Sequence, residues 1–207
     1  MKADEFSPSR DDLARWRKGE RRRLIDERLA VPASERQRSA SAVLERLVRL
    51  LSGIDNAVVS LYWPFRGELN LRPLMPILHK SGVRVSLPLV EAADRPLIFR
   101  EWTPLGRMET GIWKIPVPVD GEVLPPSIIV APLVGYDGCC YRLGYGGAFF
   151  DRTLEHLRAD GGSPQVIGVG HSGARIPTIY PQPHDGPMDV IITEAEQIER
   201  PGSGETA

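Results

Sequence analysis

The sequence predicts a single three-layer α/β/α domain, built on a mostly parallel β-sheet with helices on both faces. Short apolar runs such as AVVSLYW at 57–63 and IIVAPL at 128–133 are typical of strands buried on both faces of a sheet. Segments with helical periodicity alternate with these runs, as parallel strands require. With 207 residues, 42% of them hydrophobic and 26% charged, the chain has the size and composition of one globular domain.

The first half of the chain is expected to begin with a flexible leader and two helices. Residues 1–10 form the leader, and an intermittent apolar stripe predicts a helix over 11–30. Pro32 suits the start of a second helix over 33–51, which Gly53 ends. Strands are then expected at 57–63, 83–87 and 97–102, with a helix at 70–80 between the first two.

The second half is expected to continue the alternation and to close the domain at residue 199. The strand at 128–133 leads into a glycine-rich loop, and a helical pattern starts at Phe149. Further strands are expected at 165–170 and 190–193, with a disordered tail over 200–207. No internal repeat or linker divides the domain, so residues 11–199 form one unit.

The composition argues against several classes of protein. A net charge of −1 provides no general attraction for nucleic acid or an acidic membrane. No apolar run reaches the roughly 18 residues of a membrane span, and the N-terminus lacks a signal-peptide core. We therefore expect a cytoplasmic protein. The adjacent cysteines Cys139 and Cys140 are expected to stay reduced, because neighbouring cysteines rarely meet disulfide geometry.

The segment RLGYGGAFFDR, from Arg142 to Arg152, has the composition of a phosphate-binding loop. Glycines at 144, 146 and 147 expose backbone N–H groups just before a helix, where the helix dipole favours an anion. Arg142 and Arg152 add positive charge, and Asp151 offers a metal ligand. The alternative is an ordinary glycine turn before an ordinary helix. A dinucleotide fingerprint is excluded because Phe149 stands where its third glycine belongs, and no GxxxxGK[ST] string occurs.

Two other places carry candidate ligand-binding side chains. Arg17 and Arg21 lie four residues apart, which directs two cations to one helix face, although a solvated charged face is the alternative. Trp63 and Glu68 follow the strand at 57–63, and ligands bind beyond the carboxyl ends of such strands. An aromatic ring can stack on a flat heterocycle, and a carboxylate can accept N–H bonds from a pterin. A core tryptophan and a glutamate at a helix start are the alternatives.

The string RLGYGGAFFDR resembles the signature of the 5-formyltetrahydrofolate cyclo-ligase family, which usually reads RLGyGgGYYDr. The similarity recurs in order from about Arg17 to Glu194, and it implies the three-layer fold of that family. It implies catalytic roles for Arg142 and Asp151, and Mg²⁺ ligation by Asp151 and Asp185. It implies folate contacts by Trp63, Glu68, Trp113 and Phe149. The implied ATP contacts are Arg17, Arg21, Arg142, Leu143, Gly144, Tyr145, Gly146, Gly147, Ala148, Phe149 and Phe150.

The resemblance also implies a reaction. ATP with Mg²⁺ phosphorylates the formyl oxygen of 5-formyltetrahydrofolate, N10 attacks the activated carbon, and phosphate leaves to give 5,10-methenyltetrahydrofolate. The folate would be the monoglutamyl or polyglutamyl form, and a monomeric enzyme is expected.

The sequence departs from the family pattern at several positions, which keeps two other functions open. Phe149 and Phe150 replace a tyrosine pair, Ala148 replaces a glycine, and Arg17 replaces a lysine. Ala174 stands where a glutamine is usual. The first alternative is a paralogue that binds folate or nucleotide as a regulator without turnover. The second is a sugar-phosphate or CoA-ester enzyme on a related α/β fold.

Overall fold

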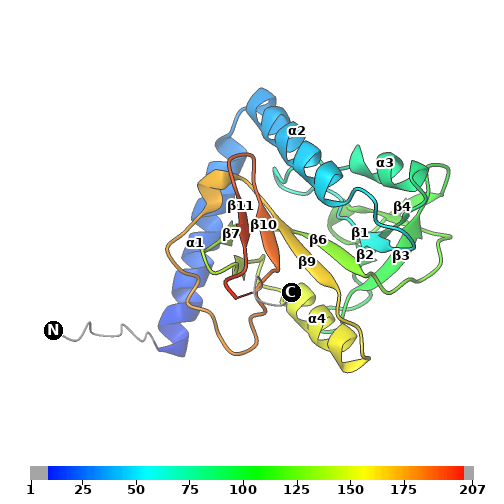
Figure 1. Ribbon diagram of the computed structural model, residues 1–207. Coiled ribbons are helices and arrows are strands. Elements are labelled where there is room, and N and C mark those ends of the chain that lie inside the picture. The colour runs from blue at the N-terminus through cyan, green and yellow to red at the C-terminus, as the bar shows by residue number, and fades with distance from the viewer. Residues whose placement is uncertain (1–8, 203–207) are drawn as a thin grey trace.

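The computed structural model describes residues 9–202, which form a seven-stranded sheet in the order β11-β10-β9-β6-β1-β2-β3 (Figure 1). The five inner strands are parallel, and the outer strands β3 and β11 run antiparallel to their neighbours. The strands of this sheet are β1 Val58–Ser60, β2 Arg84–Leu89, β3 Ile98–Trp102, β6 Ile128–Pro132, β9 Gln165–Val169, β10 Val190–Ile192 and β11 Gln197–Glu199. The predicted α/β class with a mostly parallel sheet is therefore confirmed.

Two small antiparallel hairpins lie outside the main sheet. One pairs β4 Met108–Thr110 with β5 Pro116–Pro118, and a 3₁₀ turn at Ile112–Lys114 forms its tip. The other pairs β7 Gly135–Tyr136 with β8 Arg142–Leu143 and leads directly into the glycine-rich loop. The sequence analysis placed no hairpin at either position, because strands of two or three residues are too short for a periodicity to develop.

Helices cover both faces of the sheet, which makes the three predicted layers (Figure 1). Helices α2 Ala33–Leu50 and α3 Leu74–Lys80 pack on one face, and α4 Phe149–Ala159 packs on the other. Successive residues of β6 serve the two faces in turn. Ile128 and Val130 join the core formed with α2 and α3, whereas Ile129 and Ala131 join the core formed with α4. Strands buried on both faces explain the apolar runs of the sequence.

Helix α1, Arg10–Ala30, packs beside the sheet rather than within either helical layer. Its residues Leu24 and Ile25 share a small core with Val134, Leu143 and Ile179. The helix begins at Arg10 because the Ser9 hydroxyl accepts a hydrogen bond from the Asp12 backbone N–H at 3.2 Å. Ser9 and Arg10, which were expected in the flexible leader over 1–10, therefore belong to the start of this helix. Residues 1–8 lie outside the described part of the chain.

The helices that connect the parallel strands change from one face of the sheet to the other between β1 and β6. From β1 the chain passes through α3 on one face to β2, and from β6 it passes through α4 on the other face to β9. Strands β1 and β6 are adjacent and parallel. The loops that follow them therefore diverge at one edge of the sheet, and such a switch point is where open α/β sheets bind ligands.

Several expected boundaries differ from those of the structure. Strand β1 ends at Ser60 instead of residue 63, although the Leu61 N–H still donates to the Ser86 carbonyl of β2 at 3.0 Å. Helix α3 begins at Leu74 instead of residue 70, with Pro73 at its cap position. Strand β11 was not predicted. Beyond it the Arg200 side chain pairs with Asp189 at 3.3 Å, so the ordered chain passes the expected end at residue 199, and residues 203–207 are not described.

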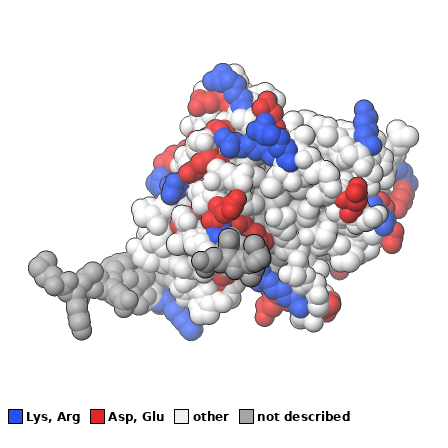
Figure 2. Space-filling model, viewed as in Figure 1, with Lys and Arg blue, Asp and Glu red and all other residues white. Residues whose placement is uncertain are grey.

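The surface agrees with the near-zero net charge. Figure 2 shows acidic and basic side chains interspersed over one face of the molecule, with no large area of a single sign. Among residues 9–202, no helix has both the length and the apolar character needed to cross a bilayer.

We expect Ala148→Gly to stabilise the protein by about 1 kcal/mol, which corresponds to a rise in Tm of roughly 2–4 °C. Ala148 caps α4 with φ 51° and ψ 20°, a left-handed conformation that a side chain disfavours. Urea denaturation measures the free energy of unfolding. The matched control is Ala14→Gly in α1, where the same change should lower stability by about 0.5–1 kcal/mol. Destabilisation by both changes would contradict the strain at Ala148.

Candidate active site

The glycine-rich loop lies between β8 and α4 and is packed too tightly for side chains at two of its positions. A Cβ atom at Gly144 would lie 2.8 Å from Nη1 of Arg142, and one at Gly147 would lie 2.7 Å from the Phe149 ring. Gly146 has φ 94°, a left-handed conformation that favours glycine. The loop therefore follows a path that leaves bare backbone at the surface of a cavity.

The N-terminus of α4 opens from this loop without a side-chain cap. The first backbone bond of the helix runs from the Arg152 N–H to the Ala148 carbonyl at 3.1 Å. The N–H groups of residues 149–151 therefore have no partner within the helix. Together with the helix dipole, these N–H groups give the helix end the partial positive charge that favours an anion.

Two arginines meet at the loop from opposite directions. Arg142 is nearly buried, donates to Asp151 Oδ1 at 3.1 Å and stacks its guanidinium 4.9 Å from the centre of the Phe150 ring. Arg21, from α1, donates through Nε to the Gly144 carbonyl at 2.7 Å. Its two Nη groups have no hydrogen-bond partner within the described residues. Burial and the nearby charge of Arg17 lower the pKa of Arg21, although Asp185 opposes this effect, so an anion would stabilise the guanidinium.

The Arg17 guanidinium makes its hydrogen bonds to groups of the protein. It contacts Asp185 at 2.5 Å and donates to the carbonyls of Ile179 at 3.2 Å and Tyr180 at 2.9 Å. Burial tends to raise the pKa of Asp185, but the bonds from Arg17 and from the Gln182 N–H hold it below the usual value. Arg17 lines the cavity as predicted, and its hydrogen bonds fix the loop that carries Asp185.

The opposite wall of the cavity carries a half-buried carboxylate. Glu68 Oε2 accepts the Phe65 N–H at 2.8 Å, and Glu68 Oε1 accepts the Tyr145 hydroxyl at 3.0 Å. Burial raises the pKa of Glu68 to about 7, against the opposing effect of these bonds and of the Arg28 charge. Glu68 is thus a hydrogen-bond acceptor that titrates near neutral pH.

Aromatic side chains flank this carboxylate. Trp63 packs partly against the core, and the Arg72 guanidinium lies 4.9 Å from the centre of its ring. Trp113 is 56% exposed at the tip of the β4–β5 hairpin, and its ring meets Phe149 edge to face at 6.0 Å. Trp113 has φ 56°, a strained conformation for such a residue, which places its ring at the cavity mouth.

These features share one cavity of about 550 Å³ at the carboxyl edge of β1 and β6. Apart from Arg152, the site residues expected from the sequence all line it: Arg17, Arg21, Trp63, Glu68, Trp113, Arg142, Leu143, Gly144, Tyr145, Gly146, Gly147, Ala148, Phe149, Phe150, Asp151 and Asp185. Arg66 and His184 also line it, although neither was among the site residues expected from the sequence. Arg66 lies between the candidates Trp63 and Glu68, and His184 precedes Asp185, so position next to a candidate was the available signal.

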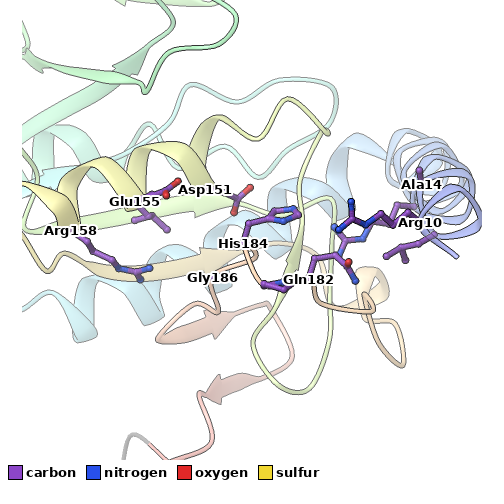
Figure 3. A pocket seen from close by; sticks show the side chains of 12 residues that line it. Arg10, Ala14, Asp151, Glu155, Arg158, Gln182, His184 and Gly186 are labelled. Carbon is purple, nitrogen blue, oxygen red and sulfur yellow. The ribbon is translucent and has the colours of Figure 1, made fainter. Parts of the chain in front are cut away.

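A second, more open cavity of about 840 Å³ adjoins the first and shares Arg17, Asp151 and His184 with it. Figure 3 shows Arg10 and Ala14 of α1 on one side, Asp151, Glu155 and Arg158 of α4 on the other, and Gln182, His184 and Gly186 between them. The two cavities meet at Arg17, Asp151 and His184.

Arg152 does not serve as the phosphate ligand suggested by the sequence. Its Nη2 donates to the carbonyls of Ala93 at 2.9 Å and Gly147 at 2.7 Å, and its guanidinium stacks 5.2 Å from the centre of the Phe149 ring. It does not line either cavity. Arg152 instead fixes the glycine loop from behind, a role that depends on a carbonyl 59 residues away and is invisible to sequence reasoning.

The residues present fit a metal that keeps few protein ligands. Within residues 9–202 no group of three His, Cys, Asp or Glu side chains forms a metal cage. Asp151 and Asp185 line the same cavity and contribute two carboxylates. Mg²⁺ is usually held by one or two carboxylates together with water and phosphate oxygens, so this donor set suits it.

The part of the chain that is similar to known proteins includes all of the residues named above that line the smaller cavity. A family model described as the 5-formyltetrahydrofolate cyclo-ligase family matches residues 14–194. The 5-formyltetrahydrofolate cyclo-ligase of Mycolicibacterium smegmatis is 32% identical over 183 residues, 84% of this chain and 92% of the relative. That of Escherichia coli K12 is 27% identical over 175 residues, 82% and 95% of the two chains. The solved 5,10-methenyltetrahydrofolate synthetase of Aquifex aeolicus superposes with a TM-score of 0.79 at 26% identity, covering 92% of this chain and 96% of that one.

We expect Glu68→Gln to remove a loss of stability that the wild-type protein shows as the pH rises from about 4.5 to 7. The raised pKa means that folded Glu68 binds its proton more tightly than unfolded Glu68, so ionisation in this window disfavours folding. Urea denaturation at pH 5 and pH 8 measures the effect. The exposed Glu45→Gln on α2 serves as control and should leave the pH dependence of the wild type unchanged. If the free energy of unfolding changed with pH by the same amount in the wild type and in Glu68→Gln, the raised pKa of Glu68 would be contradicted.

Proposed function

Because this chain belongs to the 5-formyltetrahydrofolate cyclo-ligase family, we propose that it converts 5-formyltetrahydrofolate to 5,10-methenyltetrahydrofolate with ATP and Mg²⁺. One observation supports the proposal above the others. A single cavity at the switch point of the sheet holds an open helix N-terminus, an unpaired arginine end, two carboxylates and an aromatic wall with an acceptor. Phosphate chemistry and recognition of a flat heterocycle are thus combined in one place.

The folate would occupy the part of the cavity between the β4–β5 hairpin and the loop after β1. Trp113 and Phe149 offer ring faces and edges to a pteridine at the mouth, and Trp63 forms the wall nearer the core. Glu68 would accept N–H bonds from the pterin ring when it is ionised. These assignments follow from the chemistry of the side chains and from their common cavity.

The triphosphate would lie at the junction of the two cavities. There the N–H groups at the start of α4 and the free Nη groups of Arg21 face the same space as Arg142. The larger cavity between α1, α4 and the 182–186 loop would take the nucleoside (Figure 3). The γ-phosphate would thereby point toward the folate.

Asp151 and Asp185 would hold the Mg²⁺ ion, which supplies positive charge that offsets the charge on the phosphates. Asp151 is oriented by Arg142, and Asp185 is oriented by Arg17. Each carboxylate therefore reaches the cavity from an element fixed by an arginine.

The proposed reaction needs positioning rather than a protein nucleophile. A formamide oxygen is a poor leaving group, and transfer of the γ-phosphoryl group to it creates one. N10 then forms a bond to the formyl carbon, its proton is released, and the bond from that carbon to oxygen breaks as phosphate departs. The arginines and helix N–H groups stabilise charge on the phosphoryl oxygens during transfer, which is the main demand of such chemistry.

We expect Asp151→Asn and Arg142→Ala each to lower kcat by about 10²-fold or more, because each removes charge from the site of phosphoryl transfer. The methenyl product is followed by its absorbance with ATP, Mg²⁺ and 5-formyltetrahydrofolate. Matched controls are Asp160→Asn at the far end of α4 and Arg84→Ala in an exposed ion pair, and both should retain wild-type rates. Folate binding by the wild type without turnover would favour the regulatory paralogue, and turnover indifferent to Asp151 and Arg142 would refute the site.

A further inference from the structure

Arg28 of α1 is a buried cation that the proposed reaction does not use. Its side chain is 7% exposed, and it donates to the Arg66 carbonyl at 3.0 Å, the Leu133 carbonyl at 3.1 Å and the Tyr145 hydroxyl at 2.6 Å. No carboxylate of the described residues lies within ion-pair distance of it. A buried charge without an ion-pair partner is costly to fold, so its bonding pattern calls for an explanation.

The three acceptors belong to three different segments that border the smaller cavity. Arg66 lies in the loop after β1, Leu133 follows β6, and Tyr145 lies in the glycine-rich loop. One guanidinium therefore holds together the loops that diverge at the switch point of the sheet. Arg28 itself does not line the cavity, so it can influence a ligand only through the groups that it bonds.

Tyr145 connects Arg28 to Glu68 with a fixed direction of hydrogen bonding. A guanidinium can only donate, so the Tyr145 oxygen accepts from Arg28. Its single proton then goes to Glu68 Oε1 at 3.0 Å, which is closer than the other acceptor, the Phe65 carbonyl at 3.5 Å. The other oxygen, Oε2, accepts from the Phe65 N–H. Both carboxylate oxygens are thus bonded as acceptors, an arrangement that suits ionised Glu68 and opposes its protonation.

We propose that Arg28 is a positioning residue that acts through Tyr145 to keep Glu68 an oriented hydrogen-bond acceptor for the N–H groups of the folate ring. This inference rests on the proposed function. Removal of Arg28 frees the Tyr145 hydroxyl to rotate and removes the positive charge beneath the carboxylate. Glu68 then protonates at higher pH, and its protonated form cannot accept the same set of ring N–H bonds.

The other charged and titratable groups near Glu68 do not replace Arg28. Tyr62, at the end of β1, donates its hydroxyl proton to the Leu69 carbonyl at 2.9 Å. His171 Nε2 lies 3.3 Å from the Gly67 carbonyl, and burial lowers the pKa of this histidine, so it stays neutral near pH 7. Burial raises the pKa of Glu68, whereas the Phe65 N–H, the charge of Arg28 and the Tyr145 hydroxyl lower it. Among these groups, Arg28 supplies the positive charge that acts on Glu68.

The test compares Arg28→Met, Arg28→Lys and Tyr145→Phe with the wild type from pH 5.5 to 8.5. For Arg28→Met we expect KM for 5-formyltetrahydrofolate to rise about tenfold at pH 7 with kcat changed much less. The acid limb of kcat/KM should move upward by about one pH unit. Arg28→Lys keeps the positive charge, so its acid limb of kcat/KM should lie close to that of the wild type. The control Arg23→Met loses only exposed ion pairs on α1 and should change neither quantity.

Tyr145→Phe keeps the proposal testable if Arg28→Met does not fold. It should reproduce the rise in KM and the shift of the acid limb, and the double variant should be no worse than either single one, because both changes break the same chain of bonds. Variants that lower Tm while leaving KM and the acid limb unchanged would show a purely structural role and overturn the proposal.

A binding measurement separates this inference from the proposed function. Quenching of tryptophan fluorescence by 5-formyltetrahydrofolate reports affinity without turnover. If the wild type binds but does not turn over, the proposed reaction fails, and the same pH shift in Kd between wild type and variants would still support the role of Arg28. Absence of folate binding by the wild type would overturn both.

Discussion

The close packing of the glycine-rich loop is the constraint on which the rest of the site depends. The Arg142 guanidinium lies against Gly144 and the Phe149 ring lies against Gly147, at distances where a Cβ atom would force these side chains to shift. Because the loop is this thin, an arginine and a helix N-terminus can both approach the same cavity. A bulkier loop would displace the Arg142 guanidinium and the Phe149 ring from these positions.

Helix α1 holds this arrangement from outside the sheet. Arg17, Arg21 and Arg28 are spaced by four and seven residues, which places them along one helix face. Each guanidinium bonds main-chain carbonyls of a different loop: the 179–180 segment, the glycine-rich loop, and the loops after β1 and β6. This helix face thus fixes the three sets of loops, and it brings positive charge to the site at the same time.

Glu68 and Asp185 show how environment separates two carboxylates that line one cavity. Burial acts on both, but Asp185 receives a direct contact from Arg17, whereas Glu68 meets its arginine only through a tyrosine hydroxyl. The pKa of Asp185 is therefore held low and that of Glu68 rises to about 7. An ionised group suited to a metal and an acceptor that responds to pH are thus produced from similar side chains.

The amino-acid sequence by itself determined the α/β class and the membership of the cavity. Apolar strands alternate with helices, and loops that follow parallel strands meet at one sheet edge, which places Glu68, Asp151 and the glycines near one another. For Glu68 the position alone left a structural role equally open, and the family resemblance decided for the cavity. The partners of each arginine were decided only by the tertiary structure. Arg17, Arg28 and Arg152 have similar side chains, yet one holds a carboxylate, one holds a tyrosine and one holds carbonyls. Those acceptors come from segments distant in the chain, and local sequence carries no record of which carbonyl or hydroxyl folding brings within reach of a guanidinium.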